Sequence, residues 1–219
     1  VTPGSSDAQP GYQDLPRIAA HANGDLVIVW RDSGNDGSGW GVFGRTYSAA
    51  GGFGDTFQIN TYTTSTQYNP DVATLADGGF VVVWEDHNGL DGSSYATFAQ
   101  RYDSNGAAVG DAFVVNENSN GAQYQAKVSG LATGGFVVAF YNDTGDYWGD
   151  VYLREFDAGG QPQRTPSASG PDHGRLGWRG QPAPDRSGDP ASRAAAHRAS
   201  ARRGGRQGGG GNHLLLFLG

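Results

Sequence analysis

The sequence predicts an all-β protein built from four-stranded antiparallel repeats, stacked as the blades of a partial β-propeller and followed by a disordered tail. An apolar run recurs three times, as "GDLVIVW", "GGFVVVW" and "GGFVVAF", and ends at Trp30, Trp84 and Phe140. A period near 55 residues indicates a repeat architecture. β-branched and aromatic residues dominate the runs, and residues 1–163 show no helical period, which favours strands.

The repeat divides the chain into five segments. Matching positions include Pro16 with Pro70, Asn60 with Asn116, and Gln67 with Gln123. The predicted segments are a leader or linker (1–11), repeat 1 (12–66), repeat 2 (67–122), a truncated repeat 3 (123–163) and a tail (164–219).

Within repeat 2 the apolar signal falls in four short runs, which predict four strands. They are Asp71–Leu75, Phe80–Trp84, Tyr95–Tyr102 and Ala112–Asn116. The connections are rich in Gly, Asp, Asn and Ser, the residues that favour turns. Phe80–Trp84 is apolar on both faces, so we expect neighbouring sheets to cover it on both sides.

Four antiparallel strands repeated radially form the blades of a propeller. A β-sandwich of one or two domains also fits the count of four strands. The propeller is favoured, because a sandwich does not require strict repetition of a whole unit.

Composition changes near residue 163. Residues 1–163 contain 6 basic and 19 acidic residues, whereas residues 164–219 contain 9 Arg and 3 Asp. The acidic body argues against nucleic acid as a partner, because phosphates would be repelled. It suits a soluble surface that attracts cations.

The tail has two interpretations. Its Arg, Gly, Pro, Ala and Ser are typical of a disordered basic segment. Alternatively, codons for Thr165–Ser169 exist that, shifted by one base, read Asp-Ala-Phe-Arg-Val, in register with Asp111–Val115. We favour the hypothesis that residues from about 164 onwards are a frame-shifted translation of further repeats.

The chain contains no Cys and no Met. The lack of Met, even at position 1, suggests a fragment of a longer reading frame. No signal peptide and no apolar run of membrane-spanning length is present, so membrane insertion is not expected.

Acidic loops between the second and third strands are candidate calcium sites. They read "DSGNDGSG", "DHNGLDGSS" and "NDTGDYWGD". Calcium prefers six to eight oxygen ligands, which a tight glycine-containing loop can gather. The alternative is an ordinary hairpin loop, where Asp-Gly and Asn-Gly are expected. The candidate ligands are Asp32, Asn35, Asp36, Asp86, Asn88, Asp91, Asp143 and Asp146.

Four aromatic residues beside these loops are candidate ligand-binding residues, namely Trp40, Tyr95, Tyr147 and Trp148. Exposed aromatic rings near carboxylates can stack on sugar rings, as in a lectin. Aromatic residues also commonly pack at a blade edge, and for Trp40 packing is favoured.

The sequence predicts no enzyme. His21 and His87 occupy different repeat positions, and no Ser-His-Asp set or metal-binding histidine pair can be identified. A glycosidase needs two facing carboxylates, and Asp-rich turns explain the acidic residues without catalysis.

The string "P.VA.LADGGFVVVWE…DGS…FAQRYD..G..VGDAF.VN" resembles tandem repeats of very large secreted bacterial proteins. Those proteins often carry hemolysin-type (RTX-like) calcium-binding nonapeptides and leave the cell by type I secretion. The resemblance covers residues 12–162. It implies an extracellular or cell-surface module of adhesin or propeller type, and by association calcium as a cofactor. The nonapeptide G-G-x-G-x-D-x-U-x itself is absent from the chain.

Together these observations predict a non-enzymatic structural or adhesive module, possible partners being a surface glycan or neighbouring repeats of the parent protein. The alternative is a glycan-binding propeller whose loops hold sugar with Trp and Tyr. A hydrolase domain is the least favoured interpretation.

Overall fold

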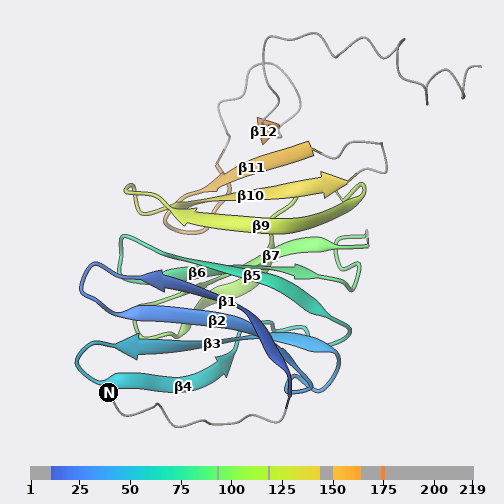
Figure 1. Cartoon of the computed structure of the whole chain (residues 1–219). Coiled ribbons are helices and arrows are strands. Elements are labelled where there is room, and N and C mark those ends of the chain that lie inside the picture. The colour runs from blue at the N-terminus through green and yellow to red at the C-terminus, as the bar shows by residue number, and fades with distance from the viewer. Residues whose placement is uncertain (1–10, 93, 118, 144–149, 164–173, 176–219) are drawn as a thin grey trace, which may run out of the picture. The chain divides into compact units, whose positions relative to one another are not determined.

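Three four-stranded antiparallel sheets form the described part of the chain (Figure 1). The computed structural model describes residues 11–92, 94–117, 119–143, 150–163 and 174–175. Blade 1 contains β1 (Gln13–Ala20), β2 (Leu26–Ser33), β3 (Trp40–Ser48) and β4 (Gly52–Gln58). Blade 2 contains β5 (Gln67–Thr74), β6 (Phe80–Asp86), β7 (Ala96–Tyr102) and β8 (Ala108–Val114). Blade 3 contains β9 (Ala122–Gly130), β10 (Phe136–Asp143), β11 (Asp150–Phe156) and β12 (Gly174–Arg175).

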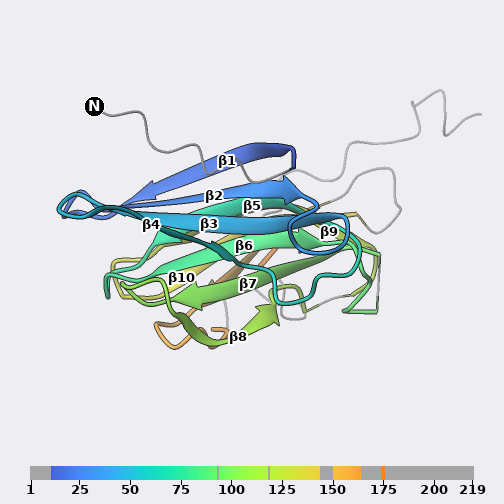
Figure 2. The ribbon, with the colours of Figure 1, turned by 90° about the horizontal axis from the view of Figure 1, so that it is seen from below.

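Each sheet follows chain order, from the first strand at one edge to the fourth at the other. This is the predicted blade of four antiparallel strands, and the all-β, propeller-type fold is confirmed. The first strands β1, β5 and β9 contact one another in turn, and Figure 2 shows β1 and β5 on one side of the stack and β8 on the other. Among the described residues, no helix is long and apolar enough to cross a membrane.

The valine-rich strand β6 is buried on both faces, as the sequence predicts. Phe80, Val82 and Trp84 pack with Val27 and Val29 of blade 1. Val81 and Val83, on the opposite face, pack in a second cluster with blade 3. These five side chains of β6 are at most 2% exposed. Burying side chains of this kind contributes roughly 1.5–3 kcal/mol each, so β6 holds two sheet interfaces together.

Every first strand carries an irregularity at the same repeat position. Leu15, Asn69 and Gln125 have positive φ angles of 50°, 48° and 57°, and the pairing with the second strand shifts register beside each of them. Such a bulge bends the strand and re-aims its side chains. The sequence pattern predicts the first strand of repeat 2 only from Asp71, because Pro70 and the bulge interrupt the alternation.

The fourth strand of blade 2 lies earlier than predicted. It spans Ala108–Val114 instead of Ala112–Asn116, because backbone pairing with β7 includes a segment with little apolar signal. Asn116 closes the strand end: its side-chain oxygen accepts a 2.9 Å hydrogen bond from the Thr97 amide. Asn60 does the same for Val42 in blade 1, at 2.8 Å. In both blades the matching asparagine therefore links the third strand to the segment that follows the fourth strand.

Beyond residue 163 the structure describes Gly174 and Arg175 alone, which pair with Leu153 and Tyr152 as the short strand β12. The sequence predicts no strand in the tail, so this pair is an exception to that prediction. The remainder of the predicted tail, and the leader apart from Gly11, lie outside the described residues.

Candidate functional site

A row of ring-bearing side chains crosses all three blades at the end of the sheets where each second strand leads into the third. Consecutive ring centroids lie between 3.9 and 6.4 Å apart. Tyr12 is 66% exposed and Tyr95 37% exposed, and the other rings are half-buried. The row, called the aromatic row below, consists of Tyr12, Trp40, Tyr68, His87, Tyr95, Tyr124 and Tyr141.

The aromatic row repeats with the blades. At the first junction, between blades 1 and 2, Trp40 at the start of β3 meets Tyr68 of β5, with centroids 6.3 Å apart and an interplanar angle of 60°. At the second junction, between blades 2 and 3, Tyr95 beside β7 meets Tyr124 of β9, at 6.4 Å and 73°. The same ring pair is thus built twice from equivalent repeat positions.

The first junction is filled by a guanidinium. The Cζ atom of Arg31 lies 3.8 Å from the ring centroid of Trp40 and 3.8 Å from that of Tyr68. Arg31 also forms a two-fold ion pair with Asp14, with a 2.7 Å bond from Nε. A cation beside aromatic faces is attracted by the ring quadrupoles. Arg31 is 6% exposed, so this junction is closed by the chain's own cation.

The second junction carries a carboxylate at the corresponding position. Glu85, 3% exposed, accepts hydrogen bonds from the Asn69 side chain at 2.7 Å and from the Gln125 backbone amide at 2.5 Å. Its other oxygen lies 3.4 Å from His87 Nε2. Burial raises the pKa of Glu85, but the hydrogen bonds from His87, Gln125 and Asn69 outweigh it and leave this pKa below the ordinary glutamate value. Glu85 therefore stays ionised.

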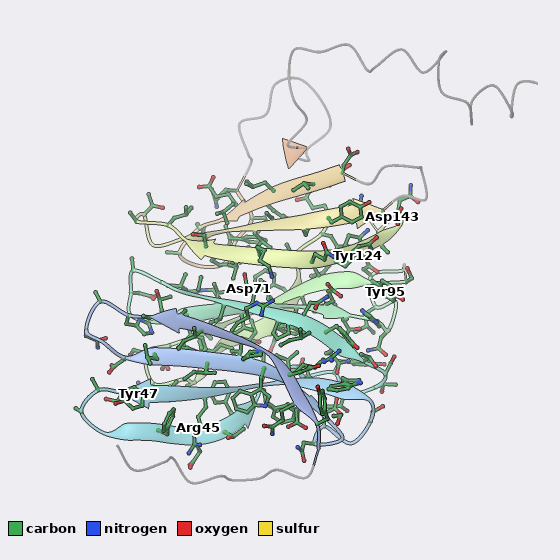
Figure 3. All side chains as sticks on the ribbon, in the orientation of Figure 1. Arg45, Tyr47, Asp71, Tyr95, Tyr124 and Asp143 are labelled. Carbon is green, nitrogen blue, oxygen red and sulfur yellow. The ribbon has the colours of Figure 1, made fainter. Side chains whose placement is uncertain are left out.

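Tyr124 connects the second junction to a further carboxylate. Its hydroxyl donates a 3.1 Å hydrogen bond to Asp143, and its ring lies 5.0 Å from that of Tyr141. Desolvation and the bond to Asp143 raise the pKa of Tyr124, so the phenol keeps its proton. Figure 3 shows Tyr95, Tyr124 and Asp143 at one end of the sheets, with Arg45 and Tyr47 at the other.

Most of the predicted calcium ligands serve the fold. Asp32 accepts hydrogen bonds from Gln13 at 2.7 Å and from the Asn35 amide at 2.6 Å. Because the side-chain N–H group of Asn35 donates to Asp32, these two predicted ligands form a hydrogen bond with each other. Asp36 accepts a hydrogen bond from the Ser38 backbone amide at 3.1 Å, and its buried Oδ2 has no hydrogen-bond partner among the residues that the structure describes.

In blade 2, Asp86 is 2% exposed and accepts bonds from Gln67 and the Asn88 backbone amide. Burial raises the pKa of Asp86 above its ordinary value, against the hydrogen bonds from Asn88 and Gln67. Asp91 accepts a 2.6 Å bond from Asn116.

No group of three or more His, Cys, Asp or Glu side chains with metal-binding geometry occurs in the described residues. Asp146, Tyr147 and Trp148 lie outside the described residues. The calcium site therefore stays a prediction from the sequence.

Of the predicted ligand-binding residues, Trp40 and Tyr95 belong to the aromatic row. Trp40 packs on Arg31, as the favoured interpretation of that residue expects. Tyr12, Tyr68, His87, Tyr124 and Tyr141 are not singled out as site residues by the sequence pattern. Tyr68 and Tyr124 each follow a matching glutamine, so their shared repeat position is the one sequence signal that could have indicated a common role.

No protein-family model matches the sequence, and no curated protein matches it. Among solved structures, a Hadza microbial sialidase is similar with a TM-score of 0.53 and 10% identity, over 68% of this chain and 36% of the sialidase. A Penicillium chrysogenum α-L-arabinanase, solved with arabinobiose, has a TM-score of 0.45 and 18% identity over 69% and 44% of the two chains. A fucose lectin from Kordia zhangzhouensis, solved with methyl-fucoside, has a TM-score of 0.40 and 8% identity over 71% and 100%.

The comparison contradicts one prediction. The sequence predicts that the chain is not an enzyme, yet the fold is shared with a sialidase, of which this chain spans 36%. The prediction was wrong because a repeat pattern specifies a scaffold, and the same scaffold carries different functions. At 10% identity the likeness establishes the fold alone, an all-β fold of the β-propeller type.

Proposed function

We propose that this chain is a carbohydrate-binding propeller segment whose ligand lies along the aromatic row. The observation that carries the proposal is the unbroken sequence of rings from three blades, with Tyr12 and Tyr95 exposed at 66% and 37%. Exposed aromatic residues gathered in one place mark a binding surface more often than scattered ones do.

The chemistry of the row suits a sugar. A sugar ring presents C–H groups on its faces, which pack on aromatic rings, while its hydroxyls need hydrogen-bond partners at the edges. Tyrosine and tryptophan combine an apolar face with a polar handle. Around the second junction, the carboxylate of Asp143 and the hydroxyl of Tyr124 lie 3.1 Å apart and supply polar groups of that kind.

The proposed setting is extracellular or at the cell surface, following the resemblance of residues 12–162 to repeats of large secreted proteins. There a glycan-binding segment would attach its parent protein to a surface. Stabilisation by calcium belongs to the same proposal, and a rise in melting temperature with added calcium that Asp91→Ala abolishes would support it.

The test is binding to a glycan array by the full chain and by Tyr95→Ala. We expect the variant to lose about fivefold or more in affinity for any glycan bound, since stacking of one ring contributes on the order of 1 kcal/mol or more. Phe53→Ala is the matched control, because Phe53 is 53% exposed and packs 5.0 Å from Tyr47 at the opposite end of the sheets (Figure 3). Equal losses in both variants, or no glycan bound, would refute the proposal.

A further inference from the structure

We propose that the second junction selects glycans that carry a positively charged amino group. This inference rests on the proposed function and adds to it the chemical class of the ligand. It follows from a comparison of the two junctions, which share a ring pair and differ in the charged residue placed beneath it.

The first junction shows what this ring pair accommodates. The guanidinium of Arg31 lies 3.8 Å from both ring centroids, between Trp40 and Tyr68. Arg31 thus occupies the site as a built-in ligand. The separation of 6.4 Å between Tyr95 and Tyr124, at an interplanar angle of 73°, is close to the 6.3 Å and 60° of the first junction, so the second junction repeats the ring spacing of the first.

Glu85 is the repeat equivalent of Arg31 and points toward the next blade in the same way. Arg31 lies opposite Asp14 in the β1–β2 pairing, and Glu85 lies opposite Tyr68 in the β5–β6 pairing. Arg31 reaches the ring of Tyr68 in blade 2, and Glu85 reaches the amide of Gln125 in blade 3, which follows Tyr124. One repeat position therefore supplies a cation at one junction and an anion at the other.

The charges at the second junction are negative. Glu85 has a single ion-pair partner in the described part of the chain, His87 at 3.4 Å, which is charged only when protonated. The described arginines that lie over aromatic rings are Arg31, Arg45 and Arg154, and none of them lies over Tyr95 or Tyr124. An ionised carboxylate can accept about four hydrogen bonds, and Glu85 receives three, from Asn69, Gln125 and His87.

A primary ammonium group on a sugar meets these requirements. It donates three hydrogen bonds and carries one positive charge, so it complements the carboxylate of Glu85. It also interacts favourably with the faces of Tyr95 and Tyr124, as Arg31 does with Trp40 and Tyr68. A neutral N-acetylated sugar of the same shape offers stacking without the charge.

The experiment compares two ligands that differ in one group, glucosamine oligomers and N-acetylglucosamine oligomers of equal length, by calorimetric titration of the full chain. We expect the amino form to bind about tenfold or more tightly, in line with a charge-assisted contact. Equal binding of both forms would overturn the selectivity for amino groups and leave the proposed function standing. Binding of neither form, with no other glycan bound on an array, would overturn the proposed function and this inference together.

Variants locate the site. Glu85→Arg copies the solution found in blade 1 and should remove the preference for the amino form, and Glu85→Gln should reduce it while keeping the side-chain size. A melting curve of each variant establishes that it folds. Preference retained in both folded variants would place amino-glycan binding elsewhere on the acidic surface and refute the inference.

A converse variant works independently of Glu85. Arg31→Ala removes the built-in cation and leaves Asp14 beside the Trp40–Tyr68 pair, so we expect a second site for glucosamine oligomers and a rise in stoichiometry from one to two. Arg45→Ala is the matched control, because Arg45 lies 5.0 Å from the Phe53 ring at the other end of the sheets. An unchanged stoichiometry in a folded Arg31→Ala variant would count against the receptor geometry that the inference assumes.

Discussion

The side-chain nitrogen of Gln123 donates a 2.7 Å hydrogen bond to the side-chain oxygen of Asn142. The two residues face each other in the β9–β10 pairing and are 0% and 2% exposed. Gln67 and Asp86 form the equivalent contact in blade 2, and Gln13 and Asp32 form it in blade 1. A carboxylate or amide at the end of each second strand is thus held by a glutamine from the first strand.

Replacing Gln67 with alanine tests this contact. Gln67 is fully buried and also accepts a 2.9 Å hydrogen bond from Asn60 of blade 1, so its loss leaves buried polar groups without partners. We expect the free energy of unfolding to fall by about 1–3 kcal/mol, measured by urea denaturation. Gln13→Ala, at the exposed equivalent position, removes a hydrogen bond from Asp32, which keeps the bond from Asn35, so we expect a smaller loss. A larger loss for Gln13→Ala than for Gln67→Ala would contradict the assignment.

Truncating Val82 tests the interface between blades 1 and 2. Its side chain is 0% exposed and lies in the cluster shared by those blades. Val82→Ala leaves a cavity, and we expect a loss of about 2 kcal/mol in the free energy of unfolding. Val151→Ala removes the same atoms from a side chain that is 45% exposed, and little change is expected there. A denaturation midpoint for Val82→Ala equal to that of the wild-type chain would mean that the blades do not pack as described.

The turns between first and second strands depend on glycine backbone geometry. Gly24, Gly78 and Gly134 have φ angles of 90°, 86° and 93°, in the left-handed region that penalises a Cβ atom by roughly 1–2 kcal/mol. Gly78→Ala should lower stability by about that amount, since the added Cβ meets nothing closer than Ser104 at 3.7 Å. Gly51 is the control, because its φ lies outside that region and an added Cβ would lie 3.9 Å from Ser48. Gly51→Ala should be neutral or slightly stabilising when the thermal melts of the two variants are compared.

Glu85 makes stability depend on pH in a defined direction. Its folded-state pKa is lowered, so the unfolded chain binds the proton more readily and the stabilisation is fully present above the ordinary glutamate pKa. It is lost as the pH falls through the lower, folded-state pKa. The stability difference between the wild-type chain and Glu85→Gln should therefore be largest near neutral pH and shrink on acidification. A difference that stays constant across the acid range would contradict the assignment of an ionised, hydrogen-bonded Glu85.

The fold was readable from the sequence because the blade core is periodic. The side chains of Phe80–Trp84 point alternately into two interfaces, and all of them are apolar. This pattern predicts that both faces of the strand are buried. Strand ends were less readable. The bulge at Asn69 and the start of β8 at Ala108 are decided by backbone pairing, which leaves little trace in side-chain polarity.

The candidate site was predicted in part. Trp40 and Tyr95 stood out as aromatic residues beside acidic loops, but the row appears only when first strands are placed beside the third strands of the preceding blade. Tyr124 and Tyr95 are 29 positions apart in the chain and belong to different repeats. The acidic loops predict calcium because carboxylates and amides recur there beside glycine. The local pattern does not show their hydrogen-bond partners, such as Gln67 for Asp86, which comes from a strand 19 positions away.

The double burial of β6 also bears on how a tandem array of such units can change over time. A substitution in a strand that is covered on both faces disturbs two neighbouring units at once, whereas a substitution in a strand with one covered face disturbs one. We therefore expect an array built this way to diverge most slowly at its doubly covered strands.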